Sequence, residues 1–533
     1  MREIKHQLPQ KKRGCWSAIL KVILISTILN VVVGIIFLIP MTEKSKILLG
    51  MVVTIGSIVF IIIYFKKGRV NIRDKKTKEI TYNPNVVSLN INNAVEVFNP
   101  FAGVFICGGA GSGKSTSLVE PIIYNAGVKG SCGVVYDFKF PELAQHVETA
   151  YKNENIVKRI YLSFTDLSIS TRINPIDPIL MKNESYAREY AYAILANINP
   201  SMISKPDFWS DSSLVFLSSV FWFLKKNHPK YCTLPHAISL ILQPDYETLL
   251  NLLETDTQCA DMIAPILTAV RSGAQNQLAG MISSLQVSLT KINTPELYYL
   301  TSESEASLDL NSRDPGKPAI LVLGNDPTLS STYGPVIGLF LTAISKNLNQ
   351  KNKYDSLFLI DEFPTVYIPN VENLPATARS NRVSTVLACQ DISQMVDKYG
   401  KTKADNILSN LGNQFYGRTT SIETAERVSK LFGKEEKIFM TTTKGRSGMQ
   451  ASSSTSYSSQ LRDLIRVQDM AKIGTGTFAV NLSEGSIRQG VAYIPPNPNC
   501  YKTPLEQIRQ VSEYEIGLVY NEIKRQAMYI LNG

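Results

Sequence analysis

The chain has 533 residues, 44% of them hydrophobic, which allows about two to four globular domains. Its formal net charge of +10 permits a polyanionic partner or an anionic membrane surface without establishing either. The seven cysteines form no C-x-x-C pair, and Cys107, Cys132 and Cys389 lie in apolar strand-like runs, so we expect reduced thiols and no disulfide scaffold. No two of the four histidines are close in sequence, which argues against a zinc site.

Two long apolar segments near the N-terminus predict a membrane anchor over residues 1–69, with helices at about 17–39 and 47–65. Each is long enough to cross a hydrocarbon core of ~30 Å at ~1.5 Å per residue. Lysines and arginines flank the pair on both outer sides, so we expect both termini in the cytoplasm and a multi-pass protein of the inner membrane. A signal peptide is an alternative, although no small-x-small cleavage site precedes Pro40, and a buried helical hairpin is another.

A glycine-rich stretch at residues 108–115 fits the phosphate-binding motif G-x-x-x-x-G-K-[ST], the P-loop. Glycine lets successive backbone N–H groups turn toward phosphate oxygens, Lys114 can reach the β- and γ-phosphates, and the Ser115 hydroxyl can coordinate Mg²⁺. A strand-like run at 103–107 precedes the loop, a helix-like stretch at 115–125 follows it, and an apolar run at 133–138 completes a βαβ unit. The alternative is a chance glycine-rich turn. The predicted nucleotide-binding residues are Gly108, Gly109, Ala110, Gly111, Ser112, Gly113, Lys114, Ser115 and Thr116.

The rest of the chain alternates between strand and helix patterns and predicts an α/β fold with a mostly parallel sheet wrapped by helices. Further strands are expected at 159–164, 319–323, 356–360 and 384–389, with a helix over 335–347. Helical periodicity dominates between 184 and 310. It predicts an inserted all-α domain over 184–312, between two parts of a nucleotide-binding domain at 70–183 and 313–533.

Four other segments are less informative. Alternating β-branched residues predict strands within 70–100, the Ser/Gly/Thr-rich stretch 445–459 predicts a flexible loop, and 504–531 predicts one or two exposed helices. The aromatic residues between Phe208 and Phe223 have helical spacing, which favours a hydrophobic core over a base-stacking surface.

The apolar strand at 357–360 ends in Asp361 and Glu362, and we expect it to lie beside the strand that precedes the P-loop. Asp361 is the predicted Mg²⁺ ligand together with Ser115, and Glu362 is the predicted general base that orients an attacking water. The alternative is a strand that ends in solvated carboxylates. Gln390, at the tip of the strand at 384–389, is a candidate sensor of the γ-phosphate, or else a simple strand cap.

Arg379 and Arg382 lie in a polar turn before the strand at 384–389. In a ring of subunits, one of them can cross the interface and neutralise transition-state charge on a neighbour's ATP. Arg418 is a weaker candidate for this role, and a solvated surface arginine is the alternative for each.

Several stretches in this order together resemble the type IV coupling proteins, the TraG/TraD-like ATPases of conjugative DNA transfer. The resemblance covers most of the chain, and its combination of motifs is far more specific than any single one. The stretches are residues 108–116, 134–139, 174–175, 359–363, 379–394, 417–418, 425–429 and 464–474.

The resemblance implies a RecA-like P-loop ATPase that assembles as a hexameric ring around a channel, each subunit with an N-terminal membrane anchor. It implies ATP-driven delivery of a relaxase-bound single DNA strand to a type IV secretion channel, with hydrolysis stimulated by DNA and ATP and Mg²⁺ as cofactors. By position, Lys114 and Ser115 would bind nucleotide and metal, Asp361 and Glu362 would serve hydrolysis, and Gln390 would sense nucleotide. The helical domain would face the cytoplasm and take part in DNA or relaxase recognition.

Arg379 becomes the arginine-finger candidate by the same resemblance. The chain departs from the family in two places. Phe140 follows Lys139 where the family usually has glycine, and no acidic tail ends the chain. Two other functions stay open on sequence alone. One is an FtsK/HerA-like DNA translocase, the former with four membrane spans and a C-terminal winged helix. The other is a non-motor membrane docking adaptor that binds ATP for assembly.

Overall fold

The computed structural model describes residues 95–271, 273, 275–447 and 450–532, together with residues 42, 44, 45, 83 and 85–89. The predicted membrane hairpin over 17–39 and 47–65 lies outside the described residues. Among the residues that are described, no helix is both long and apolar enough to cross a bilayer. Residues 1–82 and 83–533 are separate units, and the P-loop belongs to the second of them.

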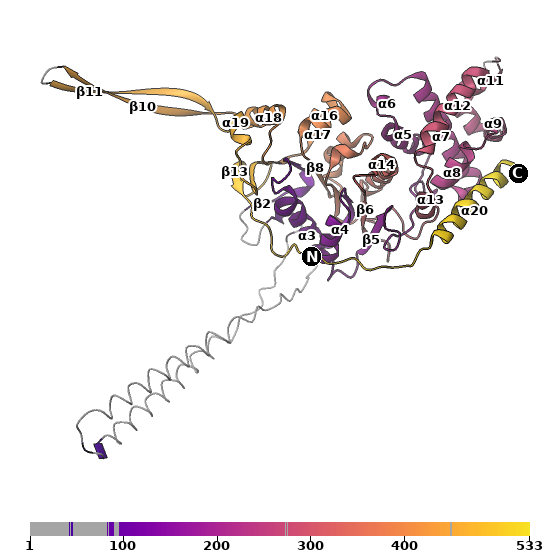
Figure 1. Ribbon diagram of the computed structural model, residues 1–533, viewed down its shortest axis with the longest axis horizontal. Coiled ribbons are helices and arrows are strands. Elements are labelled where there is room, and N and C mark those ends of the chain that lie inside the picture. The colour runs from indigo at the N-terminus through magenta and orange to yellow at the C-terminus, as the bar shows by residue number, and fades with distance from the viewer. Residues whose placement is uncertain are drawn as a thin grey trace. The chain divides into compact units, whose positions relative to one another are not determined.

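A nine-stranded mixed sheet forms the centre of this second unit and confirms the predicted α/β class (Figure 1). The strands from β9 to β5 run parallel to one another, while β12 is antiparallel to both of its neighbours. The order across the sheet is β13 (Gln489–Tyr493), β12 (Thr477–Leu482), β9 (Asn413–Tyr416), β3 (Val104–Cys107), β8 (Val383–Cys389), β7 (Ser356–Ile360), β4 (Cys132–Asp137), β6 (Ala319–Gly324) and β5 (Lys158–Ser163).

Helices cover both faces of the sheet, so its central strands are apolar along their whole length. Every residue of β3, β4, β6, β7 and β8 is buried, as expected for parallel strands with helices on both sides. Alternate residues of each strand join one of two cores. One core contains α3 (Glu120–Val128) and α4 (Glu142–Ala150), and the other contains α5 (Glu184–Ile198) and α14 (Ser330–Leu348).

The order of the strands corrects one prediction. We expected β7, which carries Asp361 and Glu362, to lie beside β3, but β8 lies between them and pairs with both. The seven residues of β8 are all buried, so this strand can occupy the middle of the sheet. Chain order does not reveal strand order here, because parallel neighbours are joined through long crossovers rather than tight turns.

The residues between β5 and β6 that the structure describes form helices and no strand. Their apolar side chains belong to the same core as one face of the sheet. The proposed domain boundaries at 183 and 312 therefore stay a prediction, because residues 83–533 form one compact unit. After α5, the helices are α6 (Ser201–Ser204), α7 (Phe208–Asn227), α8 (Leu234–Ile241), α9 (Tyr246–Glu254), α10 (Thr257–Met262), α11 (Ala264–Arg271), α12 (Gln275–Thr290) and α13 (Pro295–Thr301).

The aromatic residues of α7 divide into two groups. Phe216, Phe221, Trp222 and Phe223 are buried, as their spacing predicts, whereas Phe208 and Trp209 at the start of the helix are 52% and 42% exposed. Asp207 caps this helix by accepting a hydrogen bond from the Ser210 N–H at 2.8 Å. The first two aromatic rings therefore lie at the surface because they occupy the first turn.

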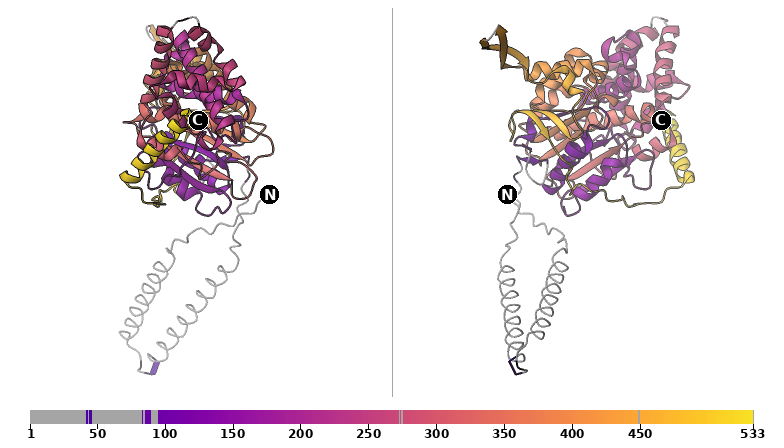
Figure 2. Two further views of the ribbon diagram at one scale, coloured as in Figure 1. Left: turned by 90° about the vertical axis from the view of Figure 1, so that its right-hand side faces the viewer. Right: turned by 60° about the vertical axis from the view of Figure 1, so that its left-hand side comes forward.

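The predicted flexible loop at 445–459 is wrong. Two strands, β10 (Lys434–Ser447) and β11 (Gln450–Asp463), form a long antiparallel ribbon, in register from Lys434 opposite Asp463 to Ser447 opposite Gln450. Serine and glycine suggested flexibility, but pairing between two 14-residue strands satisfies the backbone, and the threonines favour extended conformations. The ribbon extends from the helices α18 (Ile422–Phe432) and α19 (Val467–Met470) (Figures 1 and 2).

The C-terminal segment is more deeply packed than its sequence suggests. It reaches from α4 to the helices α8 and α13, since the Thr503 N–H donates to the Gln145 carbonyl at 3.1 Å. Gln526 of α20 (Glu513–Asn532) contacts the His236 ring at 2.8 Å. Ile523, Ala527 and Ile530 of α20 are buried, so the predicted exposed helix is a single helix with one apolar face in the core.

The remaining elements are short or peripheral. The predicted strands within 70–100 appear, among described residues, as the two-residue strands β1 and β2. The elements are β1 (Val87–Ser88), β2 (Glu96–Val97), η1 (Pro100–Ala102), η2 (Ser115–Val119), η3 (Pro229–Tyr231), η4 (Phe363–Thr365), η5 (Val371–Asn373), α15 (Leu374–Ala378), α16 (Ile392–Tyr399) and α17 (Lys401–Asn410).

Candidate active site

The P-loop joins β3 to the helical segment that begins at Ser115. Gly111 and Gly113 have φ angles of +71° and +88°, a backbone region that favours glycine. A Cβ on Gly108 would lie 2.6 Å from the Ser112 Oγ, and one on Gly113 would lie 2.8 Å from the Gly476 nitrogen. The loop is therefore a tight backbone cradle that larger residues would fill.

Two other loops hold the P-loop in place. The Gly109 N–H donates to the Arg418 carbonyl at 2.9 Å, and the Arg418 guanidinium donates to the Ala110 carbonyl at 3.3 Å. On the other side, the Thr475 hydroxyl donates to the Gly111 carbonyl and the Gly476 N–H to the Ser112 carbonyl, both at 2.9 Å. Sequence reasoning missed Thr475 and Gly476, for which the only signal was a short Gly-Thr-Gly turn before β12.

The helix after the P-loop begins with a wider turn than we predicted. Residues Ser115–Val119 form a π-helix, and the α-helix α3 starts only at Glu120. The first N–H groups of such a segment have no partner within the helix and favour an anion at its N-terminus. The hydroxyls of Ser112 and Ser117 are buried and have no hydrogen-bond partner among the described residues. The start of the helix therefore offers several unsatisfied polar groups beside the loop.

Lys114, Glu362 and Gln390 meet at the carboxyl ends of three neighbouring strands. The Lys114 ammonium lies 3.0 Å from the Glu362 Oε1, and the Gln390 amide donates to that same oxygen at 3.2 Å. Lys114 and Glu362 are only 8% and 7% exposed. Burial by itself lowers the pKa of Lys114, but the Glu362 and Asp361 carboxylates outweigh it and leave that pKa above its ordinary value.

Asp361 lies beside this pair at the end of β7. Its burial raises the pKa of the carboxyl to about 6, although the Lys114 charge opposes the shift. Its Oδ1 is buried and has no hydrogen-bond partner among the described residues. A buried carboxylate oxygen without a partner fits a divalent cation, because oxygen ligands are what Mg²⁺ prefers. The chemistry of Asp361 and Ser115 thus fits the predicted metal site.

Asp137, at the end of β4, is a buried carboxylate that we had not predicted as a site residue. Its Oδ2 accepts hydrogen bonds from the Leu143 and Ala144 N–H groups at 2.8 and 3.0 Å, which caps α4. Burial raises the pKa of Asp137 to about 7, and the neighbouring Asp361 adds to the shift. The charge of Lys139 acts in the opposite direction on Asp361 and lowers its pKa. Asp137 therefore shapes the turn that brings Lys139 toward the site.

The three candidate arginines occupy different places. Arg418 lies in the loop after β9 and touches the P-loop of its own chain. Arg382 forms a bidentate ion pair with Asp355, at 2.5 and 2.7 Å, which fixes it before β8. Arg379 is 3.4 Å from the Glu484 Oε1, and both side chains are more than half exposed. Arg379 and Arg382 precede β8, so they lie at the amino ends of the parallel strands, whereas the P-loop lies at the carboxyl ends.

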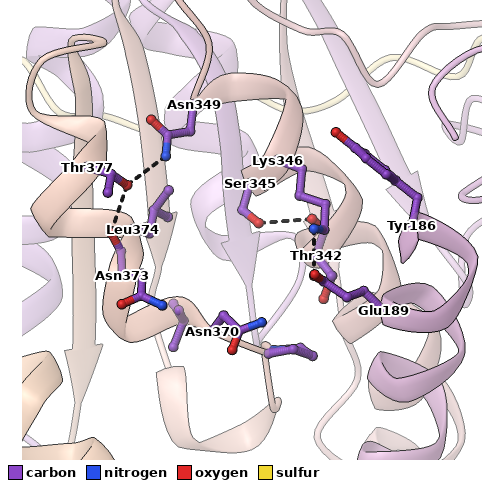
Figure 3. Close-up of a pocket in the computed structure, with 12 residues that line it drawn as sticks. Tyr186, Glu189, Thr342, Ser345, Lys346, Asn349, Asn370, Asn373, Leu374 and Thr377 are labelled. Carbon is purple, nitrogen blue, oxygen red and sulfur yellow. Dashed lines mark hydrogen bonds and ion pairs between the residues drawn. The ribbon is translucent and has the colours of Figure 1, made fainter. Parts of the chain in front are cut away.

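A cavity of about 310 Å³ lies between α5, α14 and the segment around α15 (Figure 3). None of the predicted site residues lines it. Its two charged lining residues pair with each other, since the Lys346 ammonium is 2.6 Å from the Glu189 Oε2 and 4.9 Å from the centre of the Tyr186 ring. The lining thus offers no uncompensated cation to a polyphosphate, and the chemistry lies at the P-loop.

Comparisons with known proteins find similarity to one family and to several solved structures. A family model described as "Type IV secretory system Conjugative DNA transfer" matches residues 64–477. No curated protein sequence matches the chain.

Solved structures of the bacterial conjugative coupling protein TrwB are similar in fold. The unbound form of TrwBdeltaN70 has a TM-score of 0.59 at 13% identity and covers 77% of this chain and 89% of that chain. TrwB in complex with the ATP analogue ADPNP and TrwB in complex with ADP and Mg²⁺ have TM-scores of 0.57 and 0.55. Each of these two is 13% identical and covers 77% of this chain and 87% of that chain.

The cradle geometry predicts a strong effect of Gly113→Ala. Alanine at φ +88° is strained, and its Cβ would collide with the Gly476 backbone, so the loop cannot keep its shape. We expect the variant to lose binding of a fluorescent ATP analogue. Gly334→Ala in α14, whose Cβ would meet nothing within 4 Å, should bind like the unmodified protein. Unchanged binding by Gly113→Ala, with an unaltered circular dichroism spectrum, would contradict this description of the loop.

Proposed function

This chain belongs to the type IV secretory system conjugative DNA transfer family and is a coupling protein of that kind, and we propose that it hydrolyses ATP to move a relaxase-bound single DNA strand into the secretion channel. The observation that carries the ATPase assignment is the meeting of Lys114, Glu362 and Gln390 at the carboxyl ends of β3, β7 and β8. Ligands of α/β sheets bind at this edge, where loops from several strands converge.

The residues of the site have different tasks in hydrolysis. The P-loop backbone and Lys114 would bind the phosphates, while Ser115 and Asp361 would hold Mg²⁺. When bound, Mg²⁺ would neutralise charge on the β- and γ-phosphates. Glu362 accepts a proton from the attacking water and orients it, and Gln390 contacts the γ-phosphate and the Glu362 carboxylate together.

The ion pair between Lys114 and Glu362 gives the site a resting arrangement. An entering polyphosphate carries more negative charge than one carboxylate and competes for the Lys114 ammonium, which has three donors. Glu362 then loses its cationic partner, and its carboxylate becomes free to accept a hydrogen bond from the attacking water. Hydrolysis is in this way linked to occupancy of the site, because the base is engaged until a phosphate displaces it.

We assign the candidate arginines two kinds of role in a homo-hexameric ring. Arg418 supports the P-loop and the nucleotide of its own subunit, to which it is already hydrogen-bonded. Arg379 lies at the opposite sheet edge and can reach a phosphate only in a neighbouring subunit. Its single partner in an ion pair is a half-exposed carboxylate, so little holds it back from such a contact.

We place the ring at the inner membrane through a two-helix anchor over residues 17–39 and 47–65, with both termini in the cytoplasm. The length of these apolar segments and the flanking cations support the proposal. Lipid is then a partner of the anchor, and secretion-channel components are partners of the ring.

Single substitutions at the strand tips test the ATPase. Lys114→Ala should abolish ATP binding, whereas Glu362→Gln should bind ATP and lose about 10²-fold to 10⁴-fold in kcat, because only the proton acceptor is removed. Two quantities are measured: the steady-state rate of phosphate release, with and without single-stranded DNA, and the equilibrium affinity for ATP. Glu423→Gln, an exposed change in α18, is the matched control and should leave turnover unchanged.

The same assay separates the alternative functions. Turnover in the unmodified protein should rise when single-stranded DNA is added. A docking adaptor instead of a motor would show slow hydrolysis at a rate that does not change when DNA is added. Its Lys114→Ala variant would still recruit the relaxase. Stimulation by duplex DNA but not by single strands would favour an FtsK/HerA-like translocase.

Arginine variants test the ring. Arg418→Ala should weaken ATP binding, while Arg379→Ala should retain ATP affinity and lose at least about 10³-fold in kcat. Mixing Arg379→Ala subunits with Glu362→Gln subunits should restore part of the turnover, because some interfaces then combine an intact Glu362 with a neighbour's intact Arg379. Arg382→Ala, which removes the pair with Asp355, is the control and should not show this rescue. If mixing restores no turnover to the Arg379→Ala subunits, Arg379 does not act at the ATP site of the neighbouring subunit.

Fractionation tests the anchor. The full chain should remain in the membrane pellet after an alkaline carbonate wash, and deletion of residues 1–69 should move it to the supernatant. The deletion variant should still bind ATP, since the P-loop and its supporting loops lie within residues 83–533. Recovery of the full chain in the supernatant would contradict a membrane-spanning anchor.

A further inference from the structure

Among the side chains of β10 and β11 whose exposure the structure describes, the large exposed apolar ones lie on one face of the ribbon. Ile438, Met440, Tyr457 and Leu461 are 72%, 63%, 71% and 70% exposed. The register places Met440 opposite Tyr457, Ile438 opposite Ser459 and Glu436 opposite Leu461, so these four side chains share one face of the two strands. Isolated two-stranded ribbons are marginally stable, and apolar surface gathered on one face of such a ribbon marks an interaction site.

The composition of the ribbon changes along its length. Residues 438–459 contain eleven serines and threonines, the cations Lys444 and Arg446, and no carboxylate. The acidic residues of the ribbon, Glu435, Glu436 and Asp463, all lie at its base. Serine is depleted in protein–protein interfaces, whereas serine and threonine hydroxyls and cations are common partners of nucleic-acid phosphates. The distal ribbon therefore matches a polyanion better than a protein surface.

The ends of the segment that carries the ribbon are both fastened to the P-loop. Arg418, before α18, exchanges hydrogen bonds with Gly109 and Ala110. After α19, Thr475 and Gly476 donate to the carbonyls of Gly111 and Ser112. The ribbon is roughly 45 Å long at ~3.4 Å per residue, and it projects outward from α18 and α19 (Figure 1).

We propose that single-stranded DNA lies along the face of the ribbon formed by Ile438, Met440, Tyr457 and the neighbouring hydroxyls. Phosphates accept hydrogen bonds from the serine and threonine hydroxyls and pair with the distal cations, while an unpaired base stacks on Tyr457. This inference rests on the proposed function and names the surface that receives its substrate. The segment that carries the ribbon is fastened to the P-loop at both of its ends, so DNA on the ribbon is positioned to influence ATP turnover.

A shortened ribbon tests the proposal in the full chain, purified in detergent. Lys437 and Gln460 lie opposite each other in the register, so replacing residues 438–459 by Asn-Gly removes Ile438, Met440, Tyr457 and the distal hydroxyls and cations, and it leaves a paired base with a suitable two-residue turn. We expect at least about tenfold weaker binding of fluorescein-labelled oligothymidine by anisotropy, and loss of DNA-stimulated ATP turnover. ATP affinity and turnover without DNA should be unchanged, because Arg418, Thr475 and Gly476 are retained.

Point variants separate the two kinds of contact. Lys444→Ala with Arg446→Ala removes two cations, so the slope of log affinity against log salt should become shallower by about 1.4 for a single strand. Lys152→Ala with Lys351→Ala, two exposed lysines at the amino edge of the sheet, is the matched control. Tyr457→Ser should weaken binding at least about fivefold while Tyr457→Phe retains it, because the ring is what stacks. Tyr493→Ser on β13, which is 61% exposed, is the control for loss of a surface tyrosine.

The outcomes are distinct. If the unmodified protein binds oligothymidine and the shortened ribbon binds it equally well at every salt concentration, the ribbon is not the DNA surface and the inference is wrong. If that variant instead changes only the oligomer mass in light scattering, the ribbon is a contact between copies of the chain. If the unmodified protein binds no DNA at all, the proposed function falls together with the inference.

Discussion

The rest of the site depends on one buried ion pair, between Lys114 and Glu362. Both groups are more than nine-tenths buried, and each offsets the cost of desolvating the other. The pair forms only because a parallel sheet brings the ends of β3, β8 and β7 to the same edge. A charged group in such a place needs a partner, and the pair supplies one to each group.

The P-loop is held by the chain on both of its sides. Arg418 supports it from the loop after β9, and Thr475 with Gly476 supports it from the loop before β12. Between these two contacts the chain forms α18, the ribbon and α19. This arrangement connects the phosphate cradle to a surface far from it through a continuous series of hydrogen-bonded elements. For the DNA contact that we propose, it gives a physical route from the ribbon to the P-loop.

The helical part and the C-terminal segment are joined to the sheet rather than appended to it. The apolar residues of α5, α7 and α14 form one core with a face of the sheet. The C-terminal segment bonds to α4 at one end and packs α20 against α8 and α13 at the other. The sheet, the helical part and the C-terminal segment are therefore packed into one compact unit.

The sequence by itself determined the α/β class, the P-loop, the strands on either side of it and the pair Asp361–Glu362, because these are local patterns. A glycine cradle and an apolar strand that ends in carboxylates are defined by neighbouring residues. Tertiary structure alone decided that β8 separates β3 from β7 and that Thr475 and Gly476 support the cradle. It also decided that Arg418, rather than Arg379, touches the P-loop of its own chain, and that a serine-rich stretch pairs as a ribbon. These features depend on partners elsewhere in the chain, and the composition of a segment does not show which strand pairs with it.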